Sequence, residues 1–208
     1  MTQIDTIVFD LGGVLIDWNP RYLYKKIFDT EEETEKFLSE VCHGVWNAQH
    51  DAGKPFQEGV DELTEKYPEY SEEIQAYFDR WIEMIGGEIT GTSELFHELA
   101  DSGNYQMLAL TNWSHETFPL VFNEYDFFQR FEGIVVSGVE KLIKPDPTFY
   151  QVMIDRYQIN PETSLFIDDN KDNIEAGAKL GFQVIHFQSP EQLKQELLSL
   201  GLLSGNAS

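Results

Sequence analysis

Short apolar runs rich in β-forming residues alternate with amphipathic segments along most of this chain. The apolar runs predict five strands, at residues 4–10, 105–110, 133–136, 164–167 and 183–187. Helical spacing of apolar residues predicts helices at residues 92–101, 114–123, 147–157, 171–180 and 190–200. Nearly continuous apolar strands separated by helices are typical of a parallel sheet with helices on both faces. The pattern therefore predicts an α/β fold built on a doubly wound parallel sheet.

The segment from about residue 22 to residue 88 interrupts this alternation. Its apolar residues recur at helical spacing and its acidic stretches open the segments, as the helix dipole favours. This predicts a small all-helical insert after the first strand, with Gly86 and Gly87 as hinge or C-cap residues. The predicted domains are a core of residues 1–20 and 88–208 and a helical insert of residues 21–87.

Composition and charge limit the classes of partner. The chain has 208 residues, of which 41% are hydrophobic, so one domain with a smaller lobe can bury roughly 70% of its unfolded surface. A formal net charge of −23 repels nucleic acid and anionic lipid, and neither class of partner is expected. Cys42 is the single cysteine, and the sequence shows no signal peptide and no membrane-spanning apolar stretch. We therefore expect a cytoplasmic protein, either a monomer or a homodimer.

Polar side chains follow several of the predicted strands. In a doubly wound sheet, ligands bind at the carboxyl ends of the strands, so these residues are expected to converge. The residues concerned are Asp10, Thr111 and Asn112, then Lys144 in the loop after the third strand, and finally Asp168 and Asp169. Any one of them can be explained as a cap or a turn residue. Together, and with opposite charges among them, they predict a site.

The carboxylates of this set predict a cation. Asp10 and the pair Asp168 and Asp169 would repel one another unless a cation lies between them, and hard oxygen ligands suit Mg²⁺. Gly12 fits because a residue without Cβ lets its carbonyl turn toward the metal. A metal-bound carboxylate that faces a bound phosphate is also a phosphoryl acceptor, and attack by an Asp to give an aspartyl-phosphate, followed by hydrolysis, is a known covalent strategy.

The remaining polar residues of the set predict a phosphate site. The Lys144 ammonium, the Thr111 hydroxyl and the Asn112 amide suit phosphate oxygens. Trp18 and Trp113 flank the predicted site, and they either stack on a sugar ring or simply pack where the core meets the helical insert.

Four segments in order, "FDLGGVL", "LTN", "KPDPTFY" and "FIDDNKDNIEAGAKLG", resemble the motifs of the haloacid dehalogenase-like (HAD) hydrolase superfamily over residues 4–190. The helical insert stands where that family has its cap domain. The resemblance implies a Rossmann-like core and an Mg²⁺-dependent phosphatase that acts on a small phosphorylated metabolite. Within the superfamily, the sequence is similar to the bacterial branch that includes the α-D-glucose-1-phosphate phosphatase. This similarity makes a sugar-1-phosphate one candidate substrate. The implied roles are Asp10 as nucleophile, Thr111, Asn112 and Lys144 on phosphate, and Asp10, the Gly12 carbonyl and Asp169 on Mg²⁺, with Asp168 close by.

The sequence departs from the family pattern at Gly12, where phosphatases usually have a second Asp that protonates the leaving oxygen. A general acid contributes about 10²- to 10⁴-fold to the rate. Either the enzyme is restricted to good leaving groups, or another residue, such as Asp17, supplies the proton.

Two other functions stay open at this stage. One is a metal-free 2-haloacid dehalogenase in which Asp10 attacks carbon, and the other is a catalytically weakened phosphate-binding or regulatory protein.

Overall fold

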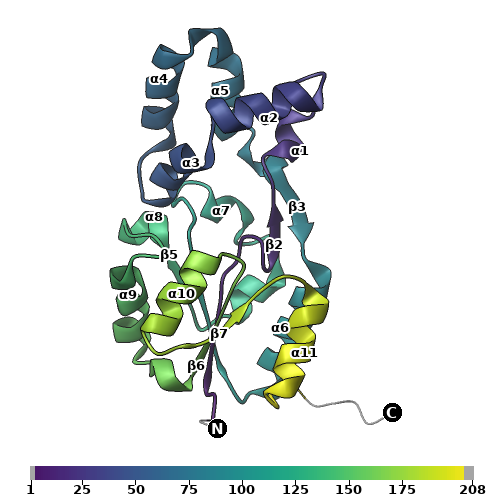
Figure 1. The fold of residues 1–208 in the computed structure, drawn as a ribbon, viewed down its shortest axis with the longest axis vertical. Coiled ribbons are helices and arrows are strands. Elements are labelled where there is room, and N and C mark those ends of the chain that lie inside the picture. The colour runs from purple at the N-terminus through teal and green to yellow at the C-terminus, as the bar shows by residue number, and fades with distance from the viewer. Residues whose placement is uncertain (1–2, 204–208) are drawn as a thin grey trace.

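In the computed structural model, which describes residues 3–203, a five-stranded parallel sheet forms the centre of the molecule (Figure 1). The strand order is β5-β4-β1-β6-β7, with β1 between β4 and β6. This confirms the predicted α/β fold with a parallel, Rossmann-like sheet. The strands are β1 Thr6–Phe9, β4 Gln106–Thr111, β5 Gly133–Val136, β6 Ser164–Asp168 and β7 Gln183–His186.

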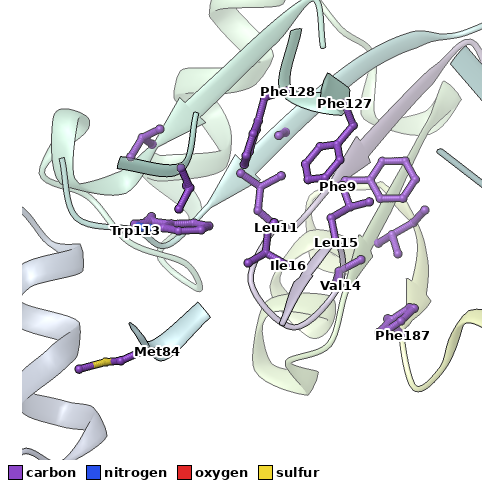
Figure 2. Packing of buried hydrophobic residues seen from close by; sticks show 14 of the residues in the cluster. Phe9, Leu11, Val14, Leu15, Ile16, Met84, Trp113, Phe127, Phe128 and Phe187 are labelled. Atoms are coloured by element: carbon purple, nitrogen blue, oxygen red, sulfur yellow. The ribbon is translucent and has the colours of Figure 1, made fainter. Parts of the chain in front are cut away.

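The central strand β1 is buried on both faces, so its side chains supply two separate cores. Ile7 and Phe9 belong to the larger hydrophobic cluster, and Val8 belongs to the smaller one. Figure 2 shows part of the larger cluster, in which Phe9, Leu11 and Leu15 take part. Because successive residues of a strand point to opposite faces, a continuous apolar run requires a cover on each side.

Helices supply this cover on the two faces. Side chains of α6 Thr90–Ser102 and α11 Pro190–Ser199 join the larger cluster, and those of α9 Pro147–Tyr157 and α10 Lys171–Lys179 join the smaller one. Shorter elements complete the connections, namely α7 Phe118–Val121, η3 Asp126–Arg130, α8 Ser137–Glu140 and η4 Pro161–Thr163. Within residues 3–203, no helix has both the length and the apolar character needed to cross a membrane.

The helical insert lies at one end of the molecule, above the sheet in Figure 1. Buried aromatic residues form its interior, including Tyr24, Phe37, Trp46, Phe56 and Tyr77. A capping box between Thr30 and Glu33 begins one of its helices. The elements are α1 Arg21–Tyr24, α2 Glu31–Glu40, α3 Gly44–Asp51, α4 Phe56–Lys66, η1 Pro68–Tyr70, α5 Ser71–Asp79 and η2 Trp81–Met84.

A two-stranded antiparallel ribbon connects the insert to the core, and the sequence did not predict it. It pairs β2 Ile16–Trp18 with β3 Ile85–Glu88. The expectation of a helix cap at Gly86 and Gly87 was wrong, because both residues lie in β3, whereas the alternative of a hinge stays a prediction. Glycine is needed there because a Cβ at Gly86 would lie 2.5 Å from Asp17 Oδ2, and because Gly87 has φ of +117°.

The helix expected at residues 114–123 is much shorter than its sequence pattern indicates, since α7 spans only Phe118–Val121. The Ser114 hydroxyl accepts a hydrogen bond from the Glu116 backbone N–H at 3.2 Å. This local turn competes with helix formation, and Pro119 lacks the N–H that a helix starting earlier would need.

Burial in the central sheet predicts that two leucine substitutions differ strongly in their effect on stability. Leu108 in β4 is fully buried, whereas Leu120 in α7 is 50% exposed. Leu108→Ala should lower the free energy of unfolding by about 2–5 kcal/mol through lost burial and an internal cavity. Leu120→Ala should lower it by less than about 1 kcal/mol. Urea denaturation of both variants measures this, and equal losses would contradict the assigned core.

Candidate active site

The carboxyl ends of three neighbouring strands meet at the buried side chain of Lys144. Lys144 Nζ lies 3.0 Å from Oδ1 of Asp10, which directly follows β1. It lies 2.7 Å from Oδ2 of Asp168 at the end of β6, and it donates a hydrogen bond of 2.7 Å to the Leu110 carbonyl of β4. One ammonium group therefore connects β1, β4 and β6, and these residues converge as a parallel sheet requires.

Thr111 is the last residue of β4, and Asn112 directly follows it. The Lys144 backbone N–H donates to Asn112 Oδ1 at 2.8 Å, and Asn112 Nδ2 donates to the Lys144 carbonyl at 3.0 Å. This reciprocal pair fixes the loop that contains the lysine. The Thr111 hydroxyl is buried and has no hydrogen-bond partner within residues 3–203. A buried hydroxyl without a partner costs free energy, so it is suited to receive a ligand oxygen.

Asp168 and Asp169 have different surroundings. The Asp168 carboxylate is fully buried and accepts from Lys144, from the Asn170 backbone N–H at 2.8 Å and from Asn173 Nδ2 at 3.1 Å to each oxygen. Asp169 is exposed, and its backbone carbonyl lies 2.9 Å from His186 Nε2. Protein donors therefore already occupy Asp168, whereas the Asp169 side chain is accessible to a ligand.

The three aspartates fit a divalent cation. Carboxylate oxygens of Asp10, Asp168 and Asp169 all lie within 4.8 Å of one another. Three carboxylates face one ammonium, so two negative charges are left to balance, and clustered hard oxygens suit Mg²⁺.

Gly13 leaves room for the Asp169 carboxylate in this cluster, and the sequence analysis did not single out Gly13. A Cβ on Gly13 would collide with the Asp169 carboxylate, and its φ of +78° also favours glycine. A Cβ on Gly12, by contrast, would meet nothing within 4 Å. The doubled glycine was the only signal in the sequence.

Burial and the neighbouring charges both shift the pKa values of Asp10 and Lys144. Burial raises the pKa of Asp10 to about 7, Lys144 opposes the shift, and Asp168 and Asp169 add to it. Burial alone would lower the pKa of Lys144, but the carboxylates of Asp10 and Asp168 outweigh it and raise that pKa. A cation beside Asp10 would favour its ionised form, which is the form able to act as a nucleophile.

A cavity of about 360 Å³ opens over these residues between the core and the helical insert. Trp18 and Trp113, expected from the sequence to flank the site, both line it. The Trp113 ring also packs on that of Trp81, with centroids 5.7 Å apart. The lining residues are Asp10, Gly12, Gly13, Trp18, Asn47, Asp51, Phe56, Trp81, Asn112, Trp113, Thr117 and Asp169. The sequence analysis had no signal for Asn47 and Asp51, because residues of the insert reach the site only through tertiary packing.

Comparison with known proteins identifies the family of this chain. The family model of haloacid dehalogenase-like hydrolases matches residues 4–181. The chain belongs to this family. The match confirms both the resemblance found in the sequence and the prediction of a hydrolase.

Relatives and solved structures of the family extend over nearly the whole chain. A sesquiterpene phosphatase from Aspergillus oryzae is 26% identical over 206 residues, which cover 96% of this chain and 97% of that protein. A D-ribitol-5-phosphate phosphatase from Bacteroides thetaiotaomicron is 24% identical over 212 residues, which cover 94% of this chain and 97% of that protein. A HAD family enzyme from Bacteroides thetaiotaomicron, solved in complex with magnesium and inorganic phosphate, has a TM-score of 0.67 at 24% identity and covers 89% of this chain and 95% of its own.

The different space available at Gly12 and Gly13 can be tested by measuring the stability of alanine variants. Gly13→Ala should lower the free energy of unfolding by about 1–3 kcal/mol, because a side chain at positive φ is strained and its Cβ collides with Asp169. Gly12→Ala meets no atom and should change it by less than about 1 kcal/mol. Chemical denaturation of the two variants measures the difference, and similar losses at both positions would refute this account of the turn.

Proposed function

We propose that this protein is an Mg²⁺-dependent phosphatase that hydrolyses a small phosphorylated metabolite through an aspartyl-phosphate on Asp10. The observation that supports this most directly is the cluster of three carboxylates and one buried lysine below a cavity. The phosphatase relatives and the related structure with magnesium and phosphate are consistent with it.

The metal ligands in this proposal are Asp10, Asp169 and the Gly12 carbonyl. Asp168 lies close by and acts mainly by orienting Lys144, because Asn173, Asn170 and Lys144 already occupy its oxygens. When bound, Mg²⁺ balances the negative charge of the carboxylates and of the phosphate, so that an anionic substrate can approach an anionic nucleophile.

The other residues bind and orient the phosphoryl group. The Lys144 ammonium and the Thr111 hydroxyl interact with its oxygens, and Asn112 holds the Lys144 loop in place. The Leu11 backbone N–H donates to Asp10 Oδ1 at 2.7 Å, so the nucleophile has a fixed orientation. Asp10 attacks phosphorus, the alcohol leaves, and water then hydrolyses the aspartyl-phosphate.

The helical insert, residues 21–87, is proposed as a cap domain that excludes water and selects the substrate. The cavity of about 360 Å³ is at the small end of ligand pockets. Trp18 lines it, and the indole Nε1 of Trp18 has no partner within residues 3–203. Indole rings and a free N–H donor fit a sugar phosphate, such as a sugar-1-phosphate, better than a long apolar chain.

The two other functions are less well supported by the same geometry. A metal-free 2-haloacid dehalogenase would place a carboxylate substrate beside Asp10, Asp168 and Asp169 with one ammonium to balance four negative charges. A phosphate-binding protein without turnover would follow from Gly12 only if no other group supplied the missing proton. Chloride release from 2-chloropropionate identifies the first, and binding of phosphate without hydrolysis identifies the second.

The role of Asp10 and of the metal can be tested with 4-nitrophenyl phosphate, whose good leaving group needs no acid. Asp10→Asn should abolish turnover, since an amide is not a nucleophile toward phosphorus. EDTA should abolish it too, and added Mg²⁺ should restore it. Asp61→Asn, an exposed position in α4, is the matched control and should retain activity. Full activity in a metal-free preparation would refute the proposal.

The lining of the cavity predicts a substrate preference. A panel of sugar-1-phosphates, sugar-6-phosphates and nucleotides should give the highest kcat/KM for a sugar phosphate, because the rings of Trp18 and Trp113 and the free indole N–H of Trp18 suit a sugar ring. Trp18→Ala should raise KM for that sugar phosphate more than for 4-nitrophenyl phosphate. A nucleotide as the best substrate would contradict the assignment of the cavity.

A further inference from the structure

A general acid is missing from the nucleophile loop, and the structure leaves its place open. Gly12 has no side chain, and nothing lies within 4 Å of where its Cβ would be. The leaving oxygen nevertheless needs a proton unless it is a very weak base. The donor must therefore reach the cavity from another element.

Asp51, at the end of α3 in the helical insert, is the remaining carboxyl in the cavity. Of the residues that line it in the described part of the chain, only Asp10, Asp51 and Asp169 bear carboxyl groups, and Asp10 and Asp169 belong to the metal cluster. We propose that Asp51 is the general acid and base of the reaction, in place of the residue missing at position 12. The assignment rests on the proposed phosphatase function.

The backbone around Asp51 is docked onto the core. The Ser137 hydroxyl donates to the Asp51 carbonyl at 2.6 Å and accepts from the Trp113 backbone N–H at 2.8 Å. Gly53 has φ of +94°, and a Cβ there would lie 2.9 Å from the Gly138 carbonyl, so the turn after α3 lies directly against α8. These contacts place Asp51 where the insert meets the core.

The Asp51 side chain is also held in one orientation. Asn47 Nδ2 donates to Asp51 Oδ2 at 3.0 Å, and the buried Tyr77 hydroxyl donates to Asn47 Oδ1 at 3.0 Å. Because Asn47 accepts from Tyr77 with its oxygen, its amino group must face Asp51. This donor at Oδ2 fixes the orientation of the Asp51 carboxyl group.

The protonation state of Asp51 suits a group that first gives and then takes a proton. Burial raises the pKa of Asp51 to about 7, and the Ser114 backbone and the charge of Lys144 limit the rise. Near neutral pH, both forms of the carboxyl are therefore populated, which is the condition for efficient acid and base catalysis.

Asp17, the alternative from the sequence, is less suited to this role. Its Oδ2 accepts from the Tyr22 hydroxyl at 2.6 Å, and it packs beside Gly86 in the ribbon. It is not among the residues that line the cavity within residues 3–203.

The proposed steps balance in atoms and electrons. An oxygen of Asp10 bonds to phosphorus as the bond from phosphorus to the leaving oxygen breaks, and that electron pair stays on the leaving oxygen. The leaving oxygen takes the proton of the Asp51 carboxyl and departs as an alcohol. Asp51 then accepts a proton from water while the water oxygen attacks phosphorus and the bond to Asp10 breaks. This releases inorganic phosphate and restores the Asp10 carboxylate and protonated Asp51.

The experiment compares leaving groups of different basicity. With Mg²⁺ present, kcat/KM is measured for 4-nitrophenyl phosphate and for phenyl phosphate with the wild type, Asp51→Asn and the control Asp61→Asn. Asp51→Asn should lose about 10²- to 10⁴-fold on phenyl phosphate and less than about tenfold on 4-nitrophenyl phosphate. Asp61→Asn should retain activity on both substrates. Equal losses on both substrates for Asp51→Asn would overturn the assignment.

A rescue variant separates a chemical role of Asp51 from a structural one. Gly12 has open space for a side chain and no positive φ, so Gly12→Asp can be introduced into the Asp51→Asn protein. It should recover at least about tenfold of the lost phenyl phosphate activity, because a carboxyl returns to the leaving oxygen. Failure to recover any activity in the folded double variant would count against the proposal.

If thermal unfolding shows that Asp51→Asn does not fold, kcat/KM values of the wild type alone still test the proposal. An enzyme with a proton donor should show kcat/KM that depends only weakly on leaving-group basicity, and a steep dependence would overturn the assignment. A wild type inactive on both substrates would refute the proposed function together with this inference. An active wild type with a steep dependence would refute the inference alone.

Discussion

The buried ammonium of Lys144 is the constraint on which the site depends. It lies between Asp10 and Asp168, and its third contact is the Leu110 carbonyl, so charges and donors are paired where solvent is absent. Burying such a group costs several kcal/mol unless its partners are well placed, and removing one partner leaves a buried charge. The ends of β1, β4 and β6 must therefore stay in register with one another. The same pairing brings the carboxylates close together, and in the proposed function a divalent cation would balance their charge.

The core and the helical insert contribute different properties to the site. The core contributes the charged residues, because the carboxyl ends of the parallel strands lie at one edge of the sheet and the polar residues there meet. The insert brings shape, since Trp81 and Phe56 close the cavity above Asp10. The ribbon of β2 and β3 joins the two parts beside this cavity, and the Phe56 backbone N–H adds a direct contact by donating to Glu116 at 2.7 Å. In the proposed function, an anion could bind in spite of the net charge of −23, because a divalent cation would balance the carboxylates around Lys144 and set the local field.

The features that could be predicted from the sequence are those set by local pattern. Apolar strands of four to six residues, such as β1 and β4, and amphipathic helices such as α9 follow from periodicity, and the convergence of Asp10 with Asp168 follows from the rule for parallel sheets. The features that were missed depend on tertiary partners. Gly13 is needed because of Asp169, which lies far along the chain, and the ribbon exists only where two short segments meet. The position of Asp51 depends on how α3 docks, and no spacing rule describes this contact.

A proton donor on the helical insert would couple chemistry to closure of the cavity. In the usual arrangement the nucleophile and the acid share one loop, so both are in place whether or not the cap is closed. With the acid on α3, Lys144 and Thr111 would still be able to bind the phosphoryl group in an open state, but a basic leaving group could not depart until α3 docks on α8. Water would then be excluded before the phosphoryl group transfers. In this arrangement, Gly12 would leave the nucleophile loop without a second carboxyl group, so that proton transfer to the leaving oxygen would depend on Asp51.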